Sequence, residues 1–313
     1  MSAPAWARAG ARAAGYRLLG PRLAYLLHTR PAEWPIMAVH TALGYVLAVG
    51  IGGAAQGERL GPALAGLAAW VVGLNGGTLA INSAFDRDEG DVAYLRAPPP
   101  PPAHLFAFGL TLMLAGLAVA LLLPGDYVAA YAVCLLLSLL YSVPPVRLKA
   151  VGGADWLINM WGFGTLTPFA GWAATGVAVS PAGRLVLLGF CPLFAAFYPL
   201  TQLYQIDEDL RRGDRTLGIR LGVRASLLAA TGCALLAFGI FGMAGVQAGW
   251  RAGGADLGRW SLLAFAGACW SAVLVPWLAG SERWTPARHQ RGMYLALAAW
   301  GVTDVVVAVA WGT

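Results

Sequence analysis

The chain has 313 residues, of which 58% are hydrophobic and 12% are charged, and its mean hydropathy is +0.65. Because soluble domains carry about 25% charged residues, this composition excludes an ordinary soluble protein and indicates a chain that crosses a membrane several times. The formal net charge of +6 is spread along the chain and is not collected on one module, which argues against nucleic acid as a partner.

The N-terminal segment, residues 1–35, is basic. Its five arginines alternate with Trp, Tyr and Leu side chains, a pattern typical of a segment that lies on the lipid surface of an anionic leaflet. A disordered basic tail before Pro21 is the alternative. Residues 1–30 lack an apolar stretch followed by a small-residue cleavage site, so we expect targeting to depend on the first membrane span.

Residues 36–313 contain nine apolar runs, each close to the roughly 20 residues that a helix needs to cross a bilayer. They lie at about 36–55, 62–82, 103–123, 127–143, 156–175, 184–204, 225–247, 260–279 and 292–311. This pattern predicts an all-α membrane protein with nine transmembrane helices in one domain. The four cysteines fall inside these runs and are expected to be small buried apolar residues.

The first polar cluster follows the second apolar run and holds Asn82, Asp86, Asp88 and Asp91. Asn82 and Asp86 are four residues apart, so they share a helix face if the helix continues this far, and the other two acids follow on the next turn. Carboxylate and amide oxygens without nearby His or Cys are ligands that suit Mg²⁺. The coordination shell of a protein-bound Mg²⁺ ion is usually completed by phosphate oxygens of the substrate. A solvated acidic loop between membrane helices is the alternative.

A basic stretch ends the fourth run and contains Arg147 and Lys149, the latter being the sole lysine of the chain. A guanidinium fork and a compact ammonium group are both suited to diphosphate oxygens. Ordinary cytoplasmic flanking charge is the alternative for this stretch.

The second polar cluster follows the sixth run and repeats the first, because Gln205 and Asp209 are again an amide and a carboxylate four residues apart, with Asp207 between them. Two such clusters could hold a diphosphate between two metal ions. Arg215 lies shortly after the second cluster. Since acids alone repel a diphosphate, metal ions or guanidinium groups must neutralise them.

The distribution of basic residues predicts the orientation of the chain in the membrane. With nine spans, 17 of the 21 Lys and Arg fall in the N-terminal segment and in the loops after the second, fourth, sixth and eighth spans. The positive-inside rule places this side in the cytoplasm. We therefore expect the N-terminus and both acidic clusters to face the cytoplasm, in the inner membrane of a bacterium.

Polar residues inside the expected spans are few. Asp304 is a functional candidate because a carboxylate within a bilayer is costly, although a hydrogen-bonded structural role is equally compatible with its place near the end of the last span. His40 and Asn159 are expected to be partners in contacts between helices.

Taken together, these stretches resemble the UbiA superfamily of intramembrane prenyltransferases, which has nine transmembrane helices. Asn82 and Asp86 match the first acidic motif of the family. Asp209, Gly213 and Thr216 match the usual end of the second motif, Tyr141 to Lys149 match the basic loop after the fourth helix, and Arg30-Pro31-x-x-Trp34 matches the entry to the first helix. The resemblance extends from about residue 28 across nearly the whole chain.

The chain departs from the family pattern in both acidic motifs. Gly90 stands where the last acid of the first motif is expected, with Asp91 beside it, and Gln205 stands where the first acid of the second motif is expected. Diphosphate binding remains compatible with these changes, but they weaken the transfer of any particular acceptor from the family.

The resemblance implies Mg²⁺-dependent transfer of an isoprenyl group from a prenyl diphosphate to a lipophilic acceptor, aromatic or isoprenoid, inside a central apolar chamber with both acidic clusters at its cytoplasmic mouth. One ion would be held by Asn82, Asp86, Asp88 and Asp91, and a second by Gln205, Asp207 and Asp209. Arg147, Lys149 and Arg215 would contact the diphosphate. Tyr204, Trp161 and Phe163 would face the allylic cation, and Asn159 would contact the substrate. The residues expected to act in catalysis are Asn82, Asp86, Asp209, Lys149 and Tyr204.

Two other functions fit parts of the sequence. A terpene cyclase on the same scaffold would let a double bond of the substrate itself capture the cation. A transporter of lipids or anions would use the charged loops as a gate, but transporters place their site near the middle of the membrane, whereas these charges gather at one face.

Overall fold

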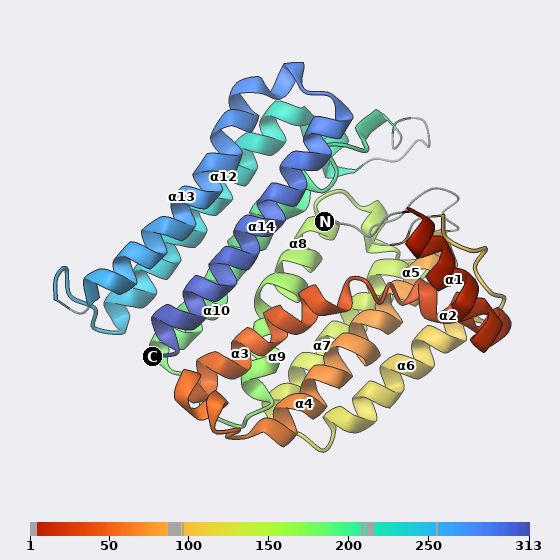
Figure 1. Cartoon of the computed structure of the whole chain (residues 1–313), viewed down its shortest axis with the longest axis horizontal. Helices are drawn as coiled ribbons and strands as arrows, with labels where there is room; N and C mark the ends of the chain where they lie inside the picture. The colour runs from red at the N-terminus through yellow and green to blue at the C-terminus, as the bar shows by residue number, and fades with distance from the viewer. Residues whose placement is uncertain (1–4, 87–94, 96, 208–209, 211–215, 255) are drawn as a thin grey trace.

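The computed structural model describes residues 5–86, 95, 97–207, 210, 216–254 and 256–313. Every element within these residues is a helix (Figure 1). In chain order they are α1 Ala5–Leu19, η1 Gly20–Arg22, α2 Leu23–His28, α3 Trp34–Ala55, α4 Leu60–Ala68, η2 Ala69–Asn75, α5 Gly76–Asp86, α6 Leu105–Ala120, α7 Gly125–Ser142, η3 Leu148–Ala150, α8 Ala154–Asn159, η4 Met160–Leu166, α9 Thr167–Ala173, α10 Pro181–Leu200, α12 Leu217–Gln247, α13 Asp256–Gly280, η5 Ser281–Arg283 and α14 Pro286–Trp311.

Within the described residues, seven helices are long and apolar enough to cross a membrane. They are α3, the continuous run of α4, η2 and α5, and then α7, α10, α12, α13 and α14. The expected span at 103–123 is α6, which has 16 residues, and the expected span at 156–175 is the continuous run of α8, η4 and α9, with a π-helical segment in its middle. The all-α membrane architecture is thus present, and the count of nine spans stays a prediction.

The helices pack around two hydrophobic cores. One core joins α10, α12, α13 and α14 to α3, and the other joins η2, α5, α6 and α7 to α9. Phe169 of α9 packs against both cores. Figure 1 shows α10, α12, α13 and α14 on one side of the molecule and α4 to α7 on the other, with α3 and α9 between them. The two cores therefore flank a central region.

Helices α3 and α9 meet at a close contact that requires glycine. A Cβ atom on Gly44 would collide with the backbone carbonyl of Pro168, and one on Gly171 would collide with the carbonyl of Thr41. Small residues allow two helix backbones to approach each other in a membrane. In the same stretch of chain Gly164 is also closely packed, whereas Gly162 has open space around it.

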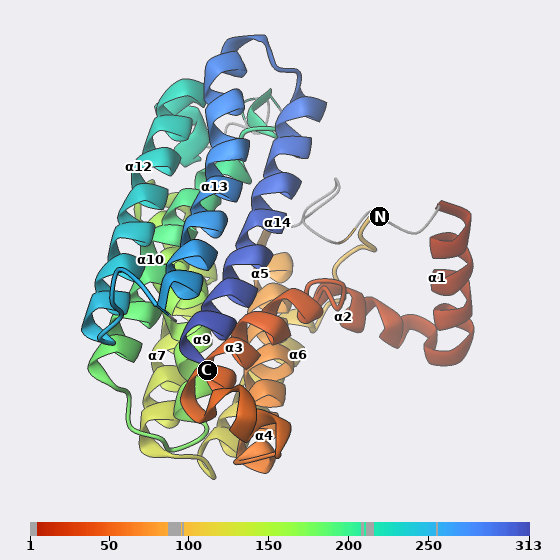
Figure 2. The same cartoon turned by 60° about the vertical axis from the view of Figure 1, so that its left-hand side comes forward.

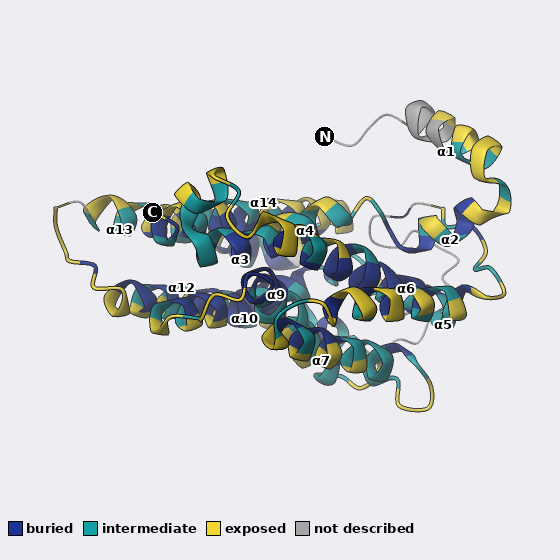
Figure 3. Ribbon diagram, turned by 90° about the horizontal axis from the view of Figure 1, so that it is seen from below, coloured by how far each residue is buried: buried dark blue, intermediate teal, exposed yellow. Residues whose placement is uncertain are grey.

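The outer faces of the helices are apolar. Leu235 and Val246 of α12 and Val275 of α13 are each more than 60% exposed. Figure 3 shows exposed residues along the outside of the helices and buried residues between them. Since water disfavours such a surface, it fits contact with lipid chains.

The basic N-terminal segment forms α1, which stands apart from the other helices (Figures 2 and 3). Leu18 at its end is 85% exposed. Arg12 on α1 donates a hydrogen bond to the carbonyl of Ala97 at 2.7 Å, and His28 on α2 lies 3.1 Å from the carbonyl of Pro99. The segment is therefore connected to the proline-rich stretch that precedes α6, and its place on a lipid surface stays a prediction.

Candidate active site

A cavity of about 350 Å³ lies between the two cores. Its wall consists of residues from α3, η2, α5, α7, α8, η4, α9, α10 and α14, together with the turns before α3 and after α10. Ligand pockets in proteins have volumes of about 300–1,000 Å³ and are mainly apolar with a few polar groups. This cavity fits that description, because aliphatic and aromatic side chains form most of its wall.

Two π-helical segments contribute to the cavity wall. Segment η2 supplies Trp70 and Asn75, and segment η4 supplies Gly162 and Phe163. Wide helical turns of this kind interrupt the α-helical hydrogen-bond ladder and frequently occur at functional sites. The turns present these side chains to the cavity, at positions that a regular helix would arrange differently.

At the mouth of the cavity, the basic stretch after α7 contacts the first acidic cluster. Lys149 donates a hydrogen bond to Oδ1 of Asn82 at 2.8 Å and forms an ion pair with Asp86. Arg147 donates to Oδ1 of Asp86 at 3.1 Å. As expected from their spacing, Asn82 and Asp86 lie one helical turn apart on α5 and face the same partners. The structure therefore brings four of the expected site residues together.

The charged side chains at this mouth differ in how far they are buried. The side chains of Lys149 and Asp86 are 13% and 17% exposed, whereas that of Arg147 is 43% exposed. Arg147 adopts a left-handed backbone conformation with φ of +35°, which is strained for a residue with a side chain and is often found at functional sites. An anion bound beside Asp86 would thus meet both cations in a partly desolvated place, where charge-assisted hydrogen bonds are strong.

The residues at the mouth fit a hard divalent cation. Asn82 and Asp86 offer an amide oxygen and a carboxylate from one face of α5, the donor types that Mg²⁺ prefers. The described part of the chain holds no group of three His, Cys, Asp or Glu residues that could bind a metal ion. The expected ligands Asp88, Asp91 and Asp209, and the expected diphosphate contact Arg215, lie outside the described residues. Substrate oxygens and those acids would have to complete the coordination.

The described part of the second cluster follows α10. Tyr204 lines the cavity, Gln205 is half-buried, and Asp207 is exposed. The structure therefore places Tyr204 on the cavity wall, and its contact with the allylic cation stays a prediction. For Gln205 and Asp207 the metal-binding role stays a prediction.

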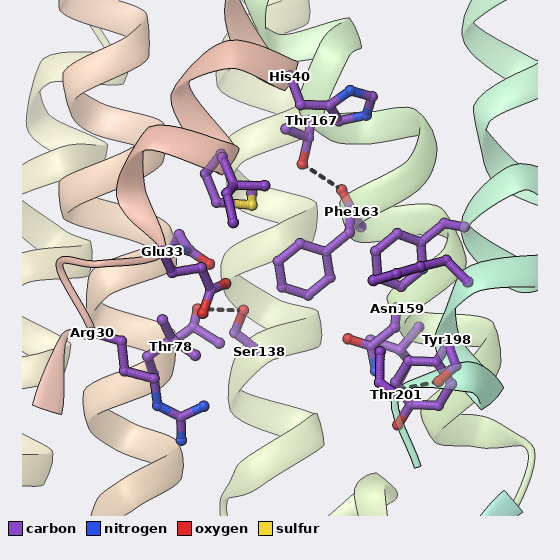
Figure 4. A pocket seen from close by; sticks show the side chains of 18 of the residues that line it. Arg30, Glu33, His40, Thr78, Ser138, Asn159, Phe163, Thr167, Tyr198 and Thr201 are labelled. Atoms are coloured by element: carbon purple, nitrogen blue, oxygen red, sulfur yellow. Dashed lines mark hydrogen bonds between the residues drawn. The ribbon is translucent and has the colours of Figure 1, made fainter. Parts of the chain in front are cut away.

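Aromatic rings line the interior of the cavity. Phe163 stacks on Phe194 with ring centroids 5.3 Å apart, and Phe194 meets Trp300 edge to face at 5.7 Å. All three rings belong to the cavity wall, and Figure 4 shows Phe163 near the centre of the cavity. Trp161 is different, because it is 43% exposed and lies outside the cavity wall. The role of Trp161 in facing the substrate stays a prediction, and the cavity wall holds Phe194 and Trp300 beside Phe163.

A buried polar network that the sequence did not indicate lies on one side of the cavity. Tyr198 donates a hydrogen bond to Oδ2 of Asp155 at 3.0 Å, and the backbone N–H of Gly153 donates to Oδ1 of the same carboxylate at 2.9 Å. Tyr141 shares hydrogen bonds with Tyr198 and Asn159. Asn159 is thus a cavity residue within this network, as Figure 4 shows. Asp155 is one isolated acid at the start of a short helix, so its sequence context gave no signal.

His40 and Asp304 form a buried pair at another part of the wall. Nδ1 of His40 lies 3.0 Å from Oδ1 of Asp304, and its Nε2 lies 3.3 Å from the carbonyl of Gly164. That carbonyl would accept a bond from residue 168 in a regular α-helix, but residue 168 is a proline without an N–H group. The imidazole of His40 therefore lies within hydrogen-bonding distance of the carbonyl group that Pro168 leaves without a helical donor. Asp304 is hydrogen-bonded to His40, which matches one of the two roles expected for it, the structural one.

Arg30 and Glu33 enter the cavity wall from the turn before α3 (Figure 4). Arg30 is buried with a left-handed backbone conformation, φ +50°. Burial of the carboxyl group raises the pKa of Glu33 to about 7, and the nearby guanidinium of Arg30 opposes this rise. Glu33 is not among the site residues predicted from the sequence, although a carboxylate directly before an apolar span is a usable signal.

Comparisons with known proteins agree with this architecture. The sequence profile of the UbiA prenyltransferase family matches residues 38–298. A search of curated protein sequences found no match. Among solved structures, a UbiA homologue from Archaeoglobus fulgidus bound to DMAPP and Mg²⁺ has a TM-score of 0.63 at 17% identity, with 91% of this chain and 99% of that chain covered.

Two further solved structures are similar. A digeranylgeranylglyceryl phosphate synthase has a TM-score of 0.67 at 14% identity, over 92% of this chain and 97% of that chain. A UbiA homologue from Aeropyrum pernix K1 has a TM-score of 0.58 at 20% identity, over 88% and 96% of the two chains. At these identities the likeness establishes the fold.

Proposed function

The chain belongs to the UbiA prenyltransferase family, and from this membership we propose that it is an Mg²⁺-dependent enzyme that transfers an isoprenyl group from a prenyl diphosphate to a lipophilic acceptor within the membrane. The acceptor is aromatic or isoprenoid, and two ions take part. The observation that carries the proposal is the contact of Lys149 and Arg147 with Asn82 and Asp86 at the mouth of an apolar cavity with aromatic walls.

The ligands of similar proteins support this donor and this metal. One structure of the Archaeoglobus fulgidus homologue contains DMAPP and Mg²⁺, and another contains GPP and Mg²⁺. The second has a TM-score of 0.62 at 17% identity to this chain. A diphosphate at the mouth and an isoprenyl chain in the cavity would match the charged and apolar parts of the site.

Each part of the site has a role in the proposed reaction. Mg²⁺, when bound, neutralises charge on the leaving diphosphate. Asn82 and Asp86 would hold the ion, together with Asp88 and Asp91, while Gln205, Asp207 and Asp209 would hold the second. Arg147, Lys149 and Arg215 would donate charge-assisted hydrogen bonds to the diphosphate oxygens, which become more negative as the C–O bond breaks.

The aromatic wall would stabilise the other product of this cleavage. Phe163, Phe194, Trp300 and Tyr204 surround the space in which the isoprenyl chain would lie. The face of an aromatic ring attracts a cation, and an apolar cavity keeps water from capturing it. The acceptor then has time to react with the allylic carbon.

Product analysis tests the proposed function. Purified protein is incubated with GPP and Mg²⁺, with and without a lipid extract, and the products are identified by mass spectrometry. A prenylated product that requires the extract supports the transferase. A cyclised hydrocarbon or alcohol from GPP alone would identify a cyclase, and the absence of diphosphate release with every prenyl donor would favour a transporter.

A further inference from the structure

We propose that Glu33 and Asn75 form an acceptor subsite that binds a hydroxyl group, and that the carboxylate of Glu33 takes the proton of this hydroxyl during transfer. The inference rests on the proposed prenyl transfer and narrows the acceptor to a lipophilic phenol or alcohol. Both residues line the cavity, Glu33 from the turn before α3 and Asn75 from the end of η2.

Asn75 supplies the first observation. Its side chain is 95% buried, lines the cavity, and its amide nitrogen has no hydrogen-bond partner among the described residues. A buried polar group without a partner lowers the stability of the fold, so such groups are rare, and each calls for an explanation such as a bound ligand. An oxygen atom in the cavity would accept from this amide, and an apolar isoprenyl chain offers none.

Glu33 supplies the second observation. Although it occupies the N-cap position of α3, its side chain does not cap the helix. Glu33 instead lines the cavity, as do Thr78 and Ser138, whose hydroxyl groups are 2.9 Å apart (Figure 4). Four polar residues that line the cavity, Glu33, Asn75, Thr78 and Ser138, make up what we call the polar patch. A hydroxyl group, which both donates and accepts, suits this patch.

The patch lies at the depth where the reaction would occur. Thr78 precedes Asn82 by one turn of α5, which is about 6 Å along the helix at 1.5 Å per residue. With the diphosphate bound beside Asn82 and Asp86, the allylic carbon would be the first part of the chain to enter the cavity. The acceptor oxygen would then be held next to that carbon, on the side of the cavity that the Tyr198–Asp155 network does not occupy.

The proposed step balances its atoms and charges. A lone pair of the hydroxyl oxygen forms the new C–O bond to the allylic carbon. The bond from that carbon to the diphosphate oxygen breaks, and its electron pair leaves with the diphosphate. The hydroxyl proton passes to the carboxylate of Glu33, so the products are a prenyl ether, diphosphate and the protonated Glu33 side chain.

This role predicts a pH dependence. Only the ionised carboxyl group accepts a proton, and burial raises the pKa of Glu33 to about 7, so the transfer rate should rise with pH through about 7 and then level off. Other titratable groups share the wall or the mouth and could add to the profile: Arg30, His40, Cys134, Tyr141, Tyr198, Tyr204 and Tyr294, with Asp86, Arg147 and Lys149 at the mouth. The contribution of Glu33 is isolated by comparing the parent with Glu33→Gln.

The first experiment measures turnover with GPP, Mg²⁺ and two hydroxyl probes, 4-hexylphenol and 1-decanol, with the methyl ether of 4-hexylphenol as the control acceptor. We expect Glu33→Gln to lower the rate of ether formation about a hundredfold or more and to remove the limb of the pH profile near 7, without changing the KM for GPP. Asn75→Leu should raise the KM for the hydroxyl probe about tenfold. Glu58→Gln, a matched change at the other end of α3, should match the parent.

The second experiment measures binding without turnover. Dicyclohexylcarbodiimide reacts with protonated carboxyl groups in apolar surroundings, and its attachment to Glu33 is followed by peptide mass spectrometry. The phenol or the alcohol should slow this labelling more than the methyl ether does, and the better protector identifies the acceptor class. Equal protection by ether and hydroxyl probes would overturn the subsite.

The outcomes separate this inference from the proposed function. If the parent releases diphosphate from GPP but Glu33→Gln keeps the rate and pH profile of the parent with the hydroxyl probes, the subsite is wrong and the prenyl transfer stands. If the parent releases no diphosphate with any donor, the proposed function fails, whatever the labelling of Glu33 shows.

Discussion

Lys149 and Asp86 form an ion pair at the mouth of the cavity, although Lys149 lies in η3, after α7, and Asp86 is the last residue of α5. The same lysine donates a hydrogen bond to Asn82. A single cation thus contacts the amide and the carboxylate that are expected to hold the metal ion. This places a positive charge where oxygen atoms of the proposed diphosphate would bind the metal ion.

The first prediction concerns Lys149. Replacing it with Ala should slow diphosphate release from GPP about ten- to a hundredfold, because a charge-assisted hydrogen bond contributes roughly 1.5–3 kcal/mol. Lys149→Arg should restore the charge but only part of the rate, since a planar fork does not reproduce a compact ammonium group. Rates are measured at saturating Mg²⁺, with Arg184→Ala as the control. Equal rates for Lys149→Ala and the parent would remove this loop from the site.

The second prediction concerns the metal ligands. Asp86→Asn keeps the size of the side chain but removes its charge, and it should lower diphosphate release about a hundredfold or more because the metal contributes several kcal/mol. The exposed Asp126, near the start of α7, provides the control Asp126→Asn, which should match the parent. Asp209→Ala should also abolish turnover. Near-normal activity of either site variant at limiting Mg²⁺ would contradict the two-metal assignment.

The third prediction uses two neighbouring aromatic residues. Phe163 lies in the cavity, and Trp161 is exposed on the outside. Phe163→Leu should lower kcat roughly five- to thirtyfold, because a desolvated cation–π contact is worth about 1–2 kcal/mol. Trp161→Leu should leave kcat unchanged. If both variants lose the same activity, the effect belongs to the packing of η4 and not to the cation.

The fourth prediction concerns orientation. A reporter inserted between α10 and α12, near Arg212, should be cytoplasmic, whereas one near Gly253 should face the other side. The expectation follows from the division of 17 against 4 basic residues between the two faces. Two reporters on the same side would reject the nine-span topology, and with it the shared face of the acidic clusters.

Local spacing predicted part of the site. Helical periodicity placed Asn82 and Asp86 on one face of α5, and the structure agrees. The contact of both with Lys149 was beyond this kind of inference, because it depends on the left-handed backbone at Arg147, which no local pattern indicates. Long-range contacts of loops are set by the packing of the helices that carry them.

The fifth expected span shows a second limit. Hydropathy predicted a helix at 156–175, and the chain is helical from 154 to 173, but it did not predict that η4 in the middle of this run is π-helical. A seven-residue π segment and a regular helix have almost the same apolar composition, so hydropathy does not separate them. Pro168 is evident in the sequence. The contact of His40 with the carbonyl of Gly164 is not, because these residues come from different helices. Trp161 lies in this π segment, so the direction of its side chain could not be read from regular helical periodicity.

The central claim is that this protein ionises a prenyl diphosphate with the help of Mg²⁺ bound at Asn82 and Asp86. The most direct test measures diphosphate release from GPP by the purified protein, with Mg²⁺ and with EDTA, for the parent and for Asp86→Asn. We predict rapid release by the parent with Mg²⁺ and almost none in the other three reactions. Release that is equally fast with EDTA, or unaffected by Asp86→Asn, would contradict this account.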